Sequence, residues 1–404
     1  IAGTGSSVSF GSQTMAGTYT VVATNATTSC VSNMTGSATI SINPLPTTYN
    51  MTGGGTLCSG AAGYNVGLSG SQTGVNYQLY NGASTVGSPV AGTGAALDFG
   101  VFTTPGTYSV VATNTSTSCQ SNMSGISVVI VNPLPNVYTT NGGGAYCTGG
   151  SGVAVGLNNS QGGINYQLYR GGVAVGSPLS GTGSALSFGL QTVAGSYSVL
   201  ATNNTTGCAS NMTGTVSVVV NPLPVVYTVT GGGSYCAGTG GVAIGMSGSE
   251  YGVTYQLYSG STPFGSPLYG TGTIMSFGMV DVAGTYTVFA TNSGTSCVNN
   301  MAGSASVSIN PLPAQYAVSG GGSYCNGTGG VSITLAGSEA GINYQLYNGA
   351  TTYGGAFGGT GSGLTFSGIT PAGTYTVLAT NPTTSCVRPM TGSATVSVLA
   401  VPQT

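Results

Sequence analysis

The sequence lacks most of the side chains that carry enzyme chemistry. It has no histidine, no tryptophan and only six charged residues in 404. The charged residues are Arg170, Arg388, Asp98, Glu250, Asp281 and Glu339. General acid–base catalysis depends on His, Asp, Glu or Lys placed close to a reacting group, and here the four carboxylates are scattered. We therefore expect no enzymatic activity, no catalytic residue and no cofactor.

The same scarcity excludes several classes of ligand. Calcium needs clustered oxygen ligands, and the sequence has no run of alternating aspartates. Zinc could use cysteine alone, but the cysteines occur singly and never as a CxxC pair, so we expect no metal site. Two arginines cannot form the basic face that nucleic acids require. The longest apolar runs, such as ISVVIV at 126–131, are too short to cross a membrane as a helix.

Low charge does not make this chain disordered. Hydrophobic residues make up 40% of it, whereas disordered chains combine low hydrophobicity with high net charge. The 73 glycines are interspersed with alternating β-branched and polar residues. We therefore expect a folded chain with many turns.

The sequence repeats every 89 residues without insertion or deletion. The tetrapeptide NPLP begins at residues 43, 132, 221 and 310. A repeat of this length is a whole domain, because the coils of a solenoid are shorter. The first residues, IAGTGSSVSFGSQT, correspond to VAGTGAALDFGVFT at 90–103, so the chain is expected to open inside a repeat. The predicted domains are half a repeat at 1–42 and full repeats at 43–131, 132–220, 221–309 and 310–404.

Within each repeat the polar and apolar residues alternate with the period of a β-strand. VSITL at 331–335 shows this alternation, and VNYQLY at 75–80 leads into Asn81-Gly82, a strong hairpin signal. Further strands are expected at 85–90, 96–100, 107–114 and 127–131. About seven short strands with no helical window predict an antiparallel β-sandwich in each domain. The prolines of NPLP favour a short, semi-rigid spacer between domains.

One line of the repeat, GTYTVVATN, resembles the sixth strand of immunoglobulin domains. In that strand a tyrosine near its start forms the tyrosine corner. The tyrosines at this position are Tyr19, Tyr108, Tyr197, Tyr286 and Tyr375. Valine stands where the usual inter-sheet cysteine would be, at residues 21, 110, 199, 288 and 377. The alternative is that these tyrosines are ordinary large strand residues.

The whole repeat resembles a known family. NPLP, GGGxYC, YQLYNG and AGTYTVxATNxxTxC, in this order, are similar to immunoglobulin-like repeats of very large cell-surface adhesins of Bacteroidota. The resemblance covers essentially the full chain. It implies tandem immunoglobulin-like domains, export by the type IX secretion system, an extracellular location at the cell surface, and a role in attachment or gliding motility. It names no ligand.

The nine cysteines form two series with the 89-residue step, and in a secreted chain they are disulfide candidates. The candidates are Cys58, Cys119, Cys147, Cys208, Cys236, Cys297, Cys325 and Cys386, with Cys30 lacking its partner. Pairing within domains would give Cys58–Cys119, Cys147–Cys208, Cys236–Cys297 and Cys325–Cys386. Strand counting places these cysteines at opposite ends of a sandwich, although a folded-back LPxxYxxxGGG segment could bring them together. Pairing between adjacent domains would give Cys58–Cys208, Cys147–Cys297 and Cys236–Cys386, and free thiols are a third alternative.

Three functional hypotheses remain open at the level of sequence. The first is a structural stalk of a surface fibre or adhesin, in which each repeat contacts only its neighbours. The second is a binding module for a glycan or protein, in which tyrosines of YQLY stack on sugar. These are Tyr77 and Tyr80, with their counterparts Tyr166, Tyr169, Tyr255, Tyr258, Tyr344 and Tyr347. Their odd spacing puts the two tyrosines of each motif on opposite faces of the sheet, so at least one of each pair is expected in the core. The third is a filament of several identical chains packed side by side through neutral faces.

Overall fold

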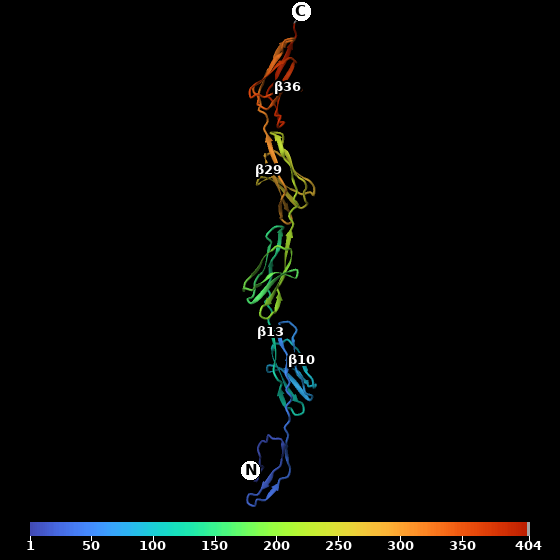
Figure 1. Ribbon diagram of the computed structural model, residues 1–404, viewed down its shortest axis with the longest axis vertical. Coiled ribbons are helices and arrows are strands. Elements are labelled where there is room, and N and C mark those ends of the chain that lie inside the picture. The colour runs from blue at the N-terminus through green and yellow to red at the C-terminus, as the bar shows by residue number, and fades with distance from the viewer. Residues whose placement is uncertain (402–404) are drawn as a thin grey trace. The chain divides into compact units, whose positions relative to one another are not determined.

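The computed structural model describes residues 1–401, and all of its regular structure is β-strand (Figure 1). Among these residues there is no helix with the length and apolar character needed to cross a membrane. The chain forms two compact units. The first comprises Ile1–Gly143, Val153–Gln191 and Gly195–Val218, and the second comprises Gly144–Gly152, Thr192–Ala194 and the chain from Val219 onward. The last residues of the predicted domain 310–404 lie outside the described residues.

The strands recur with the 89-residue step of the sequence. The first four are β1 (Gly17–Tyr19), β2 (Val22–Thr24), β3 (Val31–Asn33) and β4 (Ala38–Ile40). The next nine are β5 (Met51–Gly53), β6 (Gly55–Cys58), β7 (Tyr64–Leu68), β8 (Val75–Asn81), β9 (Ser84–Ala91), β10 (Leu97–Phe102), β11 (Gly106–Asn114), β12 (Gln120–Asn122) and β13 (Ser127–Asn132). Those of the third repeat are β14 (Thr140–Gly142), β15 (Gly144–Cys147), β16 (Val153–Leu157), β17 (Ile164–Arg170), β18 (Val173–Ser180), β19 (Leu186–Gln191), β20 (Gly195–Asn203), β21 (Ala209–Asn211) and β22 (Val216–Asn221).

The same series continues to the end of the described chain. The fourth repeat contains β23 (Val229–Gly231), β24 (Gly233–Cys236), β25 (Val242–Met246), β26 (Val253–Ser259), β27 (Thr262–Tyr269), β28 (Met275–Val280), β29 (Gly284–Asn292), β30 (Val298–Asn300) and β31 (Ala305–Asn310). The fifth contains β32 (Val318–Gly320), β33 (Gly322–Cys325), β34 (Val331–Leu335), β35 (Asn343–Asn348), β36 (Thr351–Gly358), β37 (Leu364–Ile369), β38 (Gly373–Thr380), β39 (Val387–Pro389) and β40 (Ala394–Leu399).

Each full repeat is an immunoglobulin-like sandwich of two sheets. In the second repeat the small sheet has the order β10-β7-β5, and the large sheet has the order β6-β13-β11-β8-β9, with β12 paired to β11. The fourth and fifth repeats have the same two strand orders. The chain makes seven passes through the sandwich, because β5 and β6 are one interrupted pass and β12 and β13 are another. The predicted all-β fold class is therefore confirmed.

The interruption between β5 and β6 moves the chain from one sheet to the other. β5 pairs antiparallel with β7 in the small sheet, and β6 pairs parallel with β13 in the large sheet. The crossing occurs at the triple glycine, where Gly53 has φ +85° and a Cβ would lie 1.8 Å from the carbonyl oxygen of Asn65. Only glycine tolerates both this φ and this close approach. The GGG motif of each full repeat is therefore where the chain passes from the small sheet to the large sheet.

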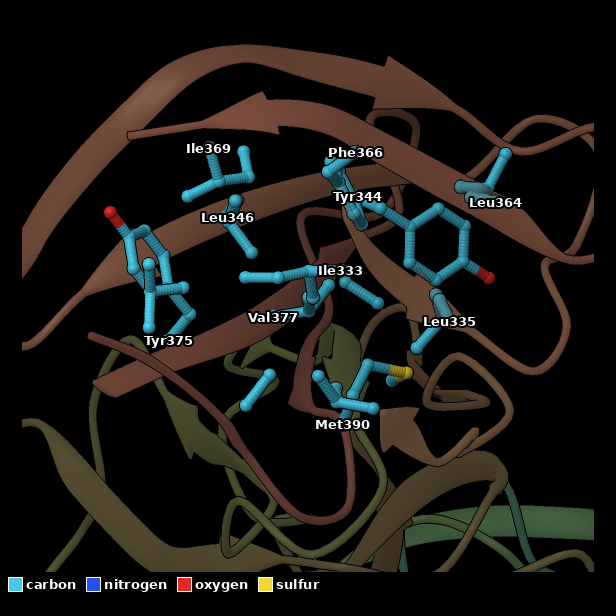
Figure 2. Close-up of a cluster of buried hydrophobic side chains, with 14 of the residues drawn as sticks. Ile333, Leu335, Tyr344, Leu346, Leu364, Phe366, Ile369, Tyr375, Val377 and Met390 are labelled. Atoms are coloured by element: carbon cyan, nitrogen blue, oxygen red, sulfur yellow. The ribbon is translucent and has the colours of Figure 1, made fainter. Parts of the chain in front are cut away.

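The core follows the two-residue period read from the sequence. In β8 every second side chain from Val75 to Leu79 is buried, while those between them are half-buried. In the last repeat Figure 2 shows the buried cluster, with Tyr344 and Tyr375 at two ends and Leu346, Ile333 and Val377 between them. The expected hairpin after YQLY also forms. Asn81 pairs with Ser84, and Gly82 in the intervening turn has φ +60°.

Candidate functional site

The tyrosines of the opening motif bind the backbone four residues upstream. The hydroxyl of Tyr108 donates to the carbonyl of Thr104 at 2.9 Å, and Tyr286 donates to Val282 at 2.8 Å. Tyr375 and Tyr19 make the same contact with Pro371 and Met15. This is the hydrogen bond of a tyrosine corner. Tyr197 is buried at the equivalent position of the third repeat.

The two tyrosines of YQLY do not form a pair of exposed rings. Tyr77 and its counterparts at 166, 255 and 344 are fully buried, and only the second tyrosine of each motif is half-buried. The hydroxyl of Tyr77 accepts the backbone N–H of Gln72 at 2.8 Å, and burial raises the pKa of Tyr77. The first tyrosine therefore belongs to the core. The expectation that at least one tyrosine of each pair belongs to the core is confirmed, so the two rings cannot both stack on sugar.

Gln78, the glutamine of YQLY, has a structural role that the sequence did not reveal. Its side-chain amide donates to the carbonyls of Leu79, Val86 and Gly87 at 2.8–3.3 Å. These carbonyls surround the place where the β8–β9 register shifts. The side chain thus takes the place of the missing ladder bonds at the bulge. The signal in the sequence was the invariance of this glutamine across the four YQLY copies.

One cysteine of each repeat sits in the turn between the strand of the tyrosine corner and the short strand that follows it, as between β11 and β12. In the second repeat this turn runs from Asn114 to Cys119. The Asn114 side chain accepts the backbone N–H groups of Ser116 and Thr117, both at 3.0 Å, and Ser118 has φ +58°. The TNxxTxC motif is therefore a tight Asn-capped turn that presents its cysteine at the end of the sandwich.

The other cysteine lies at the opposite end. Cys58 is the last residue of β6 and is in register with Asn132, and the N–H of Ser59 donates to the carbonyl of Asn132 at 2.9 Å. The beginning of β11, at Gly106, pairs with Val129, so Cys58 lies beyond the start of β11 and Cys119 beyond its end. Nine residues of strand span roughly 27 Å, whereas a disulfide needs Cα atoms within about 7 Å.

The disulfides in the structure join adjacent repeats. Cys58 is bonded to Cys208, with a Cα–Cα distance of 5.6 Å. Two equivalent bonds, each with a sequence separation of 150, are Cys147–Cys297 and Cys236–Cys386. The alternative pairing within domains is contradicted. Cys58–Cys119, Cys147–Cys208, Cys236–Cys297 and Cys325–Cys386 do not form, because the two cysteines of each repeat lie at opposite ends of its sandwich.

Three cysteines of the described chain carry no disulfide. Cys30 and Cys325 are exposed, and Cys119 is half-buried. Cys119 and Cys325 were candidates for pairing, and neither is paired here. By contrast, Cys208, Cys297 and Cys386 are fully buried within their disulfides. The cysteine of the TNxxTxC turn is therefore buried from solvent where it is disulfide-bonded, and at least partly exposed where it is not.

The linker between repeats is shorter than the NPLP motif suggests. Its asparagine ends a strand of the preceding repeat, as Asn310 does in β31, where its carbonyl accepts the N–H of Ala237. The second proline of each motif is buried, and the first is exposed. The carbonyl of this second proline, Pro313, accepts a hydrogen bond from the Arg388 guanidinium at 3.2 Å. Only Pro311 and Leu312 therefore lie between Asn310 and Pro313, whose backbone carbonyls are both hydrogen-bonded.

A further hydrogen bond fixes the residue that directly follows the second proline of the linker. The N–H of Val225 donates to the Glu250 carboxylate at 2.7 Å, and the N–H of Ala314 donates to Glu339 at 2.6 Å. In the two preceding repeats glutamine does the same: Gln161 accepts the N–H of Asn136 at 3.1 Å. Two of the four acidic residues are thus structural. Their place directly after a recurring serine, in SGSQ, NNSQ, SGSE and AGSE, was the signal available in the sequence.

Among the described residues there is no group of three or more His, Cys, Asp or Glu side chains that could hold a metal ion. The described residues do form covalent and hydrogen-bonded contacts between repeats.

Comparison with known proteins returns structures but no sequence family. No protein-family model and no curated protein matches this sequence. Domains 1–4 of Sidekick-1 match with 13% identity and a TM-score of 0.26, covering 89% of this chain and 98% of theirs. The four-domain ICAM-5 ectodomain fragment matches with 12% identity and a TM-score of 0.35, covering 87% and 100%. The mouse nectin-like molecule 4 ectodomain matches with 11% identity and a TM-score of 0.31, covering 64% and 98%. At these scores and identities the similarity carries no conclusion about the function of this chain.

Proposed function

We propose that this chain is a structural stalk of an extracellular fibre or adhesin and provides reach and mechanical integrity. The observation that supports the proposal is the set of three disulfides, each of which crosses a junction between repeats. Interfaces between domains of one chain are commonly small and mobile. A covalent bond beside a two-residue linker opposes that mobility.

The setting and the biological role are part of this proposal. Disulfides persist in oxidising compartments outside the cytosol, which supports an extracellular location. The motifs NPLP, GGGxYC and YQLYNG support a surface adhesin of the Bacteroidota type, exported by type IX secretion and used in attachment or gliding. On this view the repeats contact their neighbours in the chain, and recognition is carried out elsewhere or by a single specialised repeat.

Because each disulfide joins one repeat to the next, the disulfides limit how far the chain can be stretched. Under tension the shortest covalent path between Cys58 and Cys386 runs across Cys58–Cys208, along the chain to Cys236, and across Cys236–Cys386. That path contains about 28 residues and spans at most about 110 Å, whereas the unlinked chain between the same cysteines spans up to about 1,180 Å. The stalk would therefore keep its length even when a repeat unfolds.

Single-molecule stretching of the full chain between its termini tests this proposal. Unfolding of the oxidised protein should release little length between Cys58 and Cys386, and adding reductant should release about 1,000 Å more. The pairing within domains would instead leave a path of about 84 residues, or roughly 320 Å. Recovery of a disulfide-linked Cys147–Cys208 peptide from unreduced protein would contradict the pairing between adjacent repeats.

Two double variants make the test quantitative. Cys58→Ser with Cys208→Ser lengthens the shortest path to about 150 residues, roughly 550 Å. Cys147→Ser with Cys297→Ser leaves the shortest path unchanged, because this bond lies off that path. Equal lengthening in both variants would contradict the proposed load path. Cys325→Ser, which alters a free thiol, is the matched control.

A further inference from the structure

One repeat differs from the others in its exposed surface. In the fourth repeat Tyr251, Tyr269 and Ile274 are 81%, 76% and 77% exposed. The equivalent positions of the other full repeats hold small residues. They are Thr73, Gly162 and Ala340 for Tyr251, Ala91, Ser180 and Gly358 for Tyr269, and Ala96, Ala185 and Gly363 for Ile274. Three large apolar side chains have therefore been added to an otherwise shared frame.

The three side chains come from two adjoining loops. Tyr251 lies in the loop between β25 and β26, and its ring lies against Gly272, where an added Cβ would be 2.6 Å from the ring. Tyr269 and Ile274 flank the loop from β27 to β28 that contains Gly272. Each is at most three residues from Gly272, so its Cα lies within about 11 Å of that glycine. We call Tyr251, Tyr269 and Ile274 the tyrosine patch.

The loops beneath the tyrosine patch are held in place by a buried hydroxyl. Ser249 is 3% exposed, its hydroxyl donates to the carbonyl of Thr273 at 2.7 Å, and it accepts the N–H of Thr271 at 3.1 Å. In addition, the hydroxyl of Tyr255 accepts the backbone N–H of Glu250 at 2.9 Å. A ligand that binds here does not have to order these loops, which removes one cost of binding.

The chemistry of the tyrosine patch favours a neutral ligand. The two arginines of the chain, Arg170 and Arg388, belong to the third and fifth repeats, and the nearby Glu250 carboxylate is engaged by the N–H of Val225. The rim carries the hydroxyls of Thr271 and Thr273, whose oxygens are 3.0 Å apart. Exposed tyrosine combines a flat apolar face with a polar hydroxyl. Flat aromatic faces beside neutral hydroxyls suit the C–H faces and hydroxyl groups of sugars.

The size of the tyrosine patch argues against a second copy of the chain as its occupant. Taken at about 150–250 Å² for each full side chain, the three expose roughly 450 Å². A stable protein–protein contact buries about 800 Å² on each partner. A patch of this size is nevertheless as large as the functional patches of many monomers. We propose that the fourth repeat binds a neutral hexose oligosaccharide at the tyrosine patch.

Calorimetric titration of the full chain with cellohexaose and with maltohexaose tests the inference. At least one of the two should bind the unaltered protein. The triple variant Tyr251→Thr, Tyr269→Ala, Ile274→Ala takes the residues of the second repeat, and should bind at least tenfold more weakly. Met279→Ala removes an apolar side chain of the same repeat that is 61% exposed, and it should bind like the unaltered protein.

Three results would overturn the inference. The first is no binding of either sugar, and the second is binding that the triple variant retains. The third is concentration-dependent dimerisation in sedimentation that the triple variant abolishes, which would make the tyrosine patch a contact between copies. Because the frame tolerates small residues at all three positions in the neighbouring repeats, the triple variant should melt like the unaltered protein.

Discussion

At the scale of single residues, repeated polar side chains stabilise the backbone where the sheets are irregular. Gln78 bonds three carbonyls at a bulge, and Asn114 caps the turn that presents Cys119. Such side-chain bonds to the backbone replace those that a regular ladder would supply. The repeat therefore conserves a few polar residues as strictly as its apolar ones.

The tyrosine corner leads to a prediction for Tyr286. The substitution Tyr286→Phe removes one net hydrogen bond and should cost about 1 kcal/mol of unfolding free energy in the fourth repeat. Amide exchange of β29 should become about fivefold faster. Tyr251→Phe, at a ring that is 81% exposed, is the control and should change nothing. Unaltered exchange in Tyr286→Phe would mean that the hydroxyl adds no stability.

The turn before the cysteine of the TNxxTxC motif leads to a second prediction. Ser296 has φ +58°, a left-handed conformation that costs a residue with a Cβ about 1 kcal/mol or more. The third repeat already has glycine there, Gly207 with φ +72°. Ser296→Gly should stabilise the fourth repeat by up to about 1 kcal/mol, measured by chemical denaturation. A loss of stability would show that the serine side chain contributes more than the backbone strain costs.

At the scale of elements, the interrupted first pass is the feature that builds the sandwich. β23 belongs to the small sheet of the fourth repeat and β24 to the large one, with the triple glycine 231–233 at the crossing. A strand that joins both sheets ties them together level with the start of β29, towards the end of the repeat that faces the following repeat. Its last residue, Cys236, then carries the disulfide to the next repeat.

The crossing predicts that Gly231 cannot be replaced. A Cβ at Gly231 would lie 2.1 Å from the carbonyl oxygen of Ala243, and its φ is +89°. Gly231→Ala should therefore destabilise the fourth repeat by about 3 kcal/mol or more, through overlap and backbone strain together. Gly294→Ala is the control, because its nearest atom would be 3.5 Å away. Similar melting of the two variants would contradict the crossing geometry.

At the scale of the whole molecule, the near absence of charge is compatible with the fold because backbone and neutral side chains make the contacts. The acidic residues Glu250 and Glu339 accept backbone N–H groups, a role that Gln72 and Gln161 fill in other repeats. The junctions therefore do not depend on ion pairs. A neutral surface also leaves little repulsion between neighbouring chains.

The titration of tyrosine sets the pH range over which the fold is stable. Burial raises the pKa of Tyr77, Tyr108 and Tyr375 above the ordinary value of 10.0. Below pH 10 these groups are protonated in both the folded and the unfolded chain, so their contribution is complete. Above it the unfolded chain releases protons first, and stability falls as pH rises towards the folded pKa.

Stability should therefore be flat between about pH 6 and 9, since the chain has no histidine. It should then fall above about pH 10. Thermal melting across this range, together with the absorbance change of ionised tyrosine, checks the expectation. A midpoint that drops between pH 6 and 8 would contradict it.

The sequence by itself determined the repeat length, the strands and the turns, because these depend on local chemistry. Alternation predicted β34 at 331–335, and Asn81-Gly82 predicted the hairpin between β8 and β9. Local patterns also singled out Tyr286 and the cysteines. Only the tertiary structure decided the partners of those cysteines, because pairing depends on which ends of the strands meet. The parallel register of β6 with β13 places Cys58 at the end of its repeat opposite to Cys119, next to Cys208 of the following repeat.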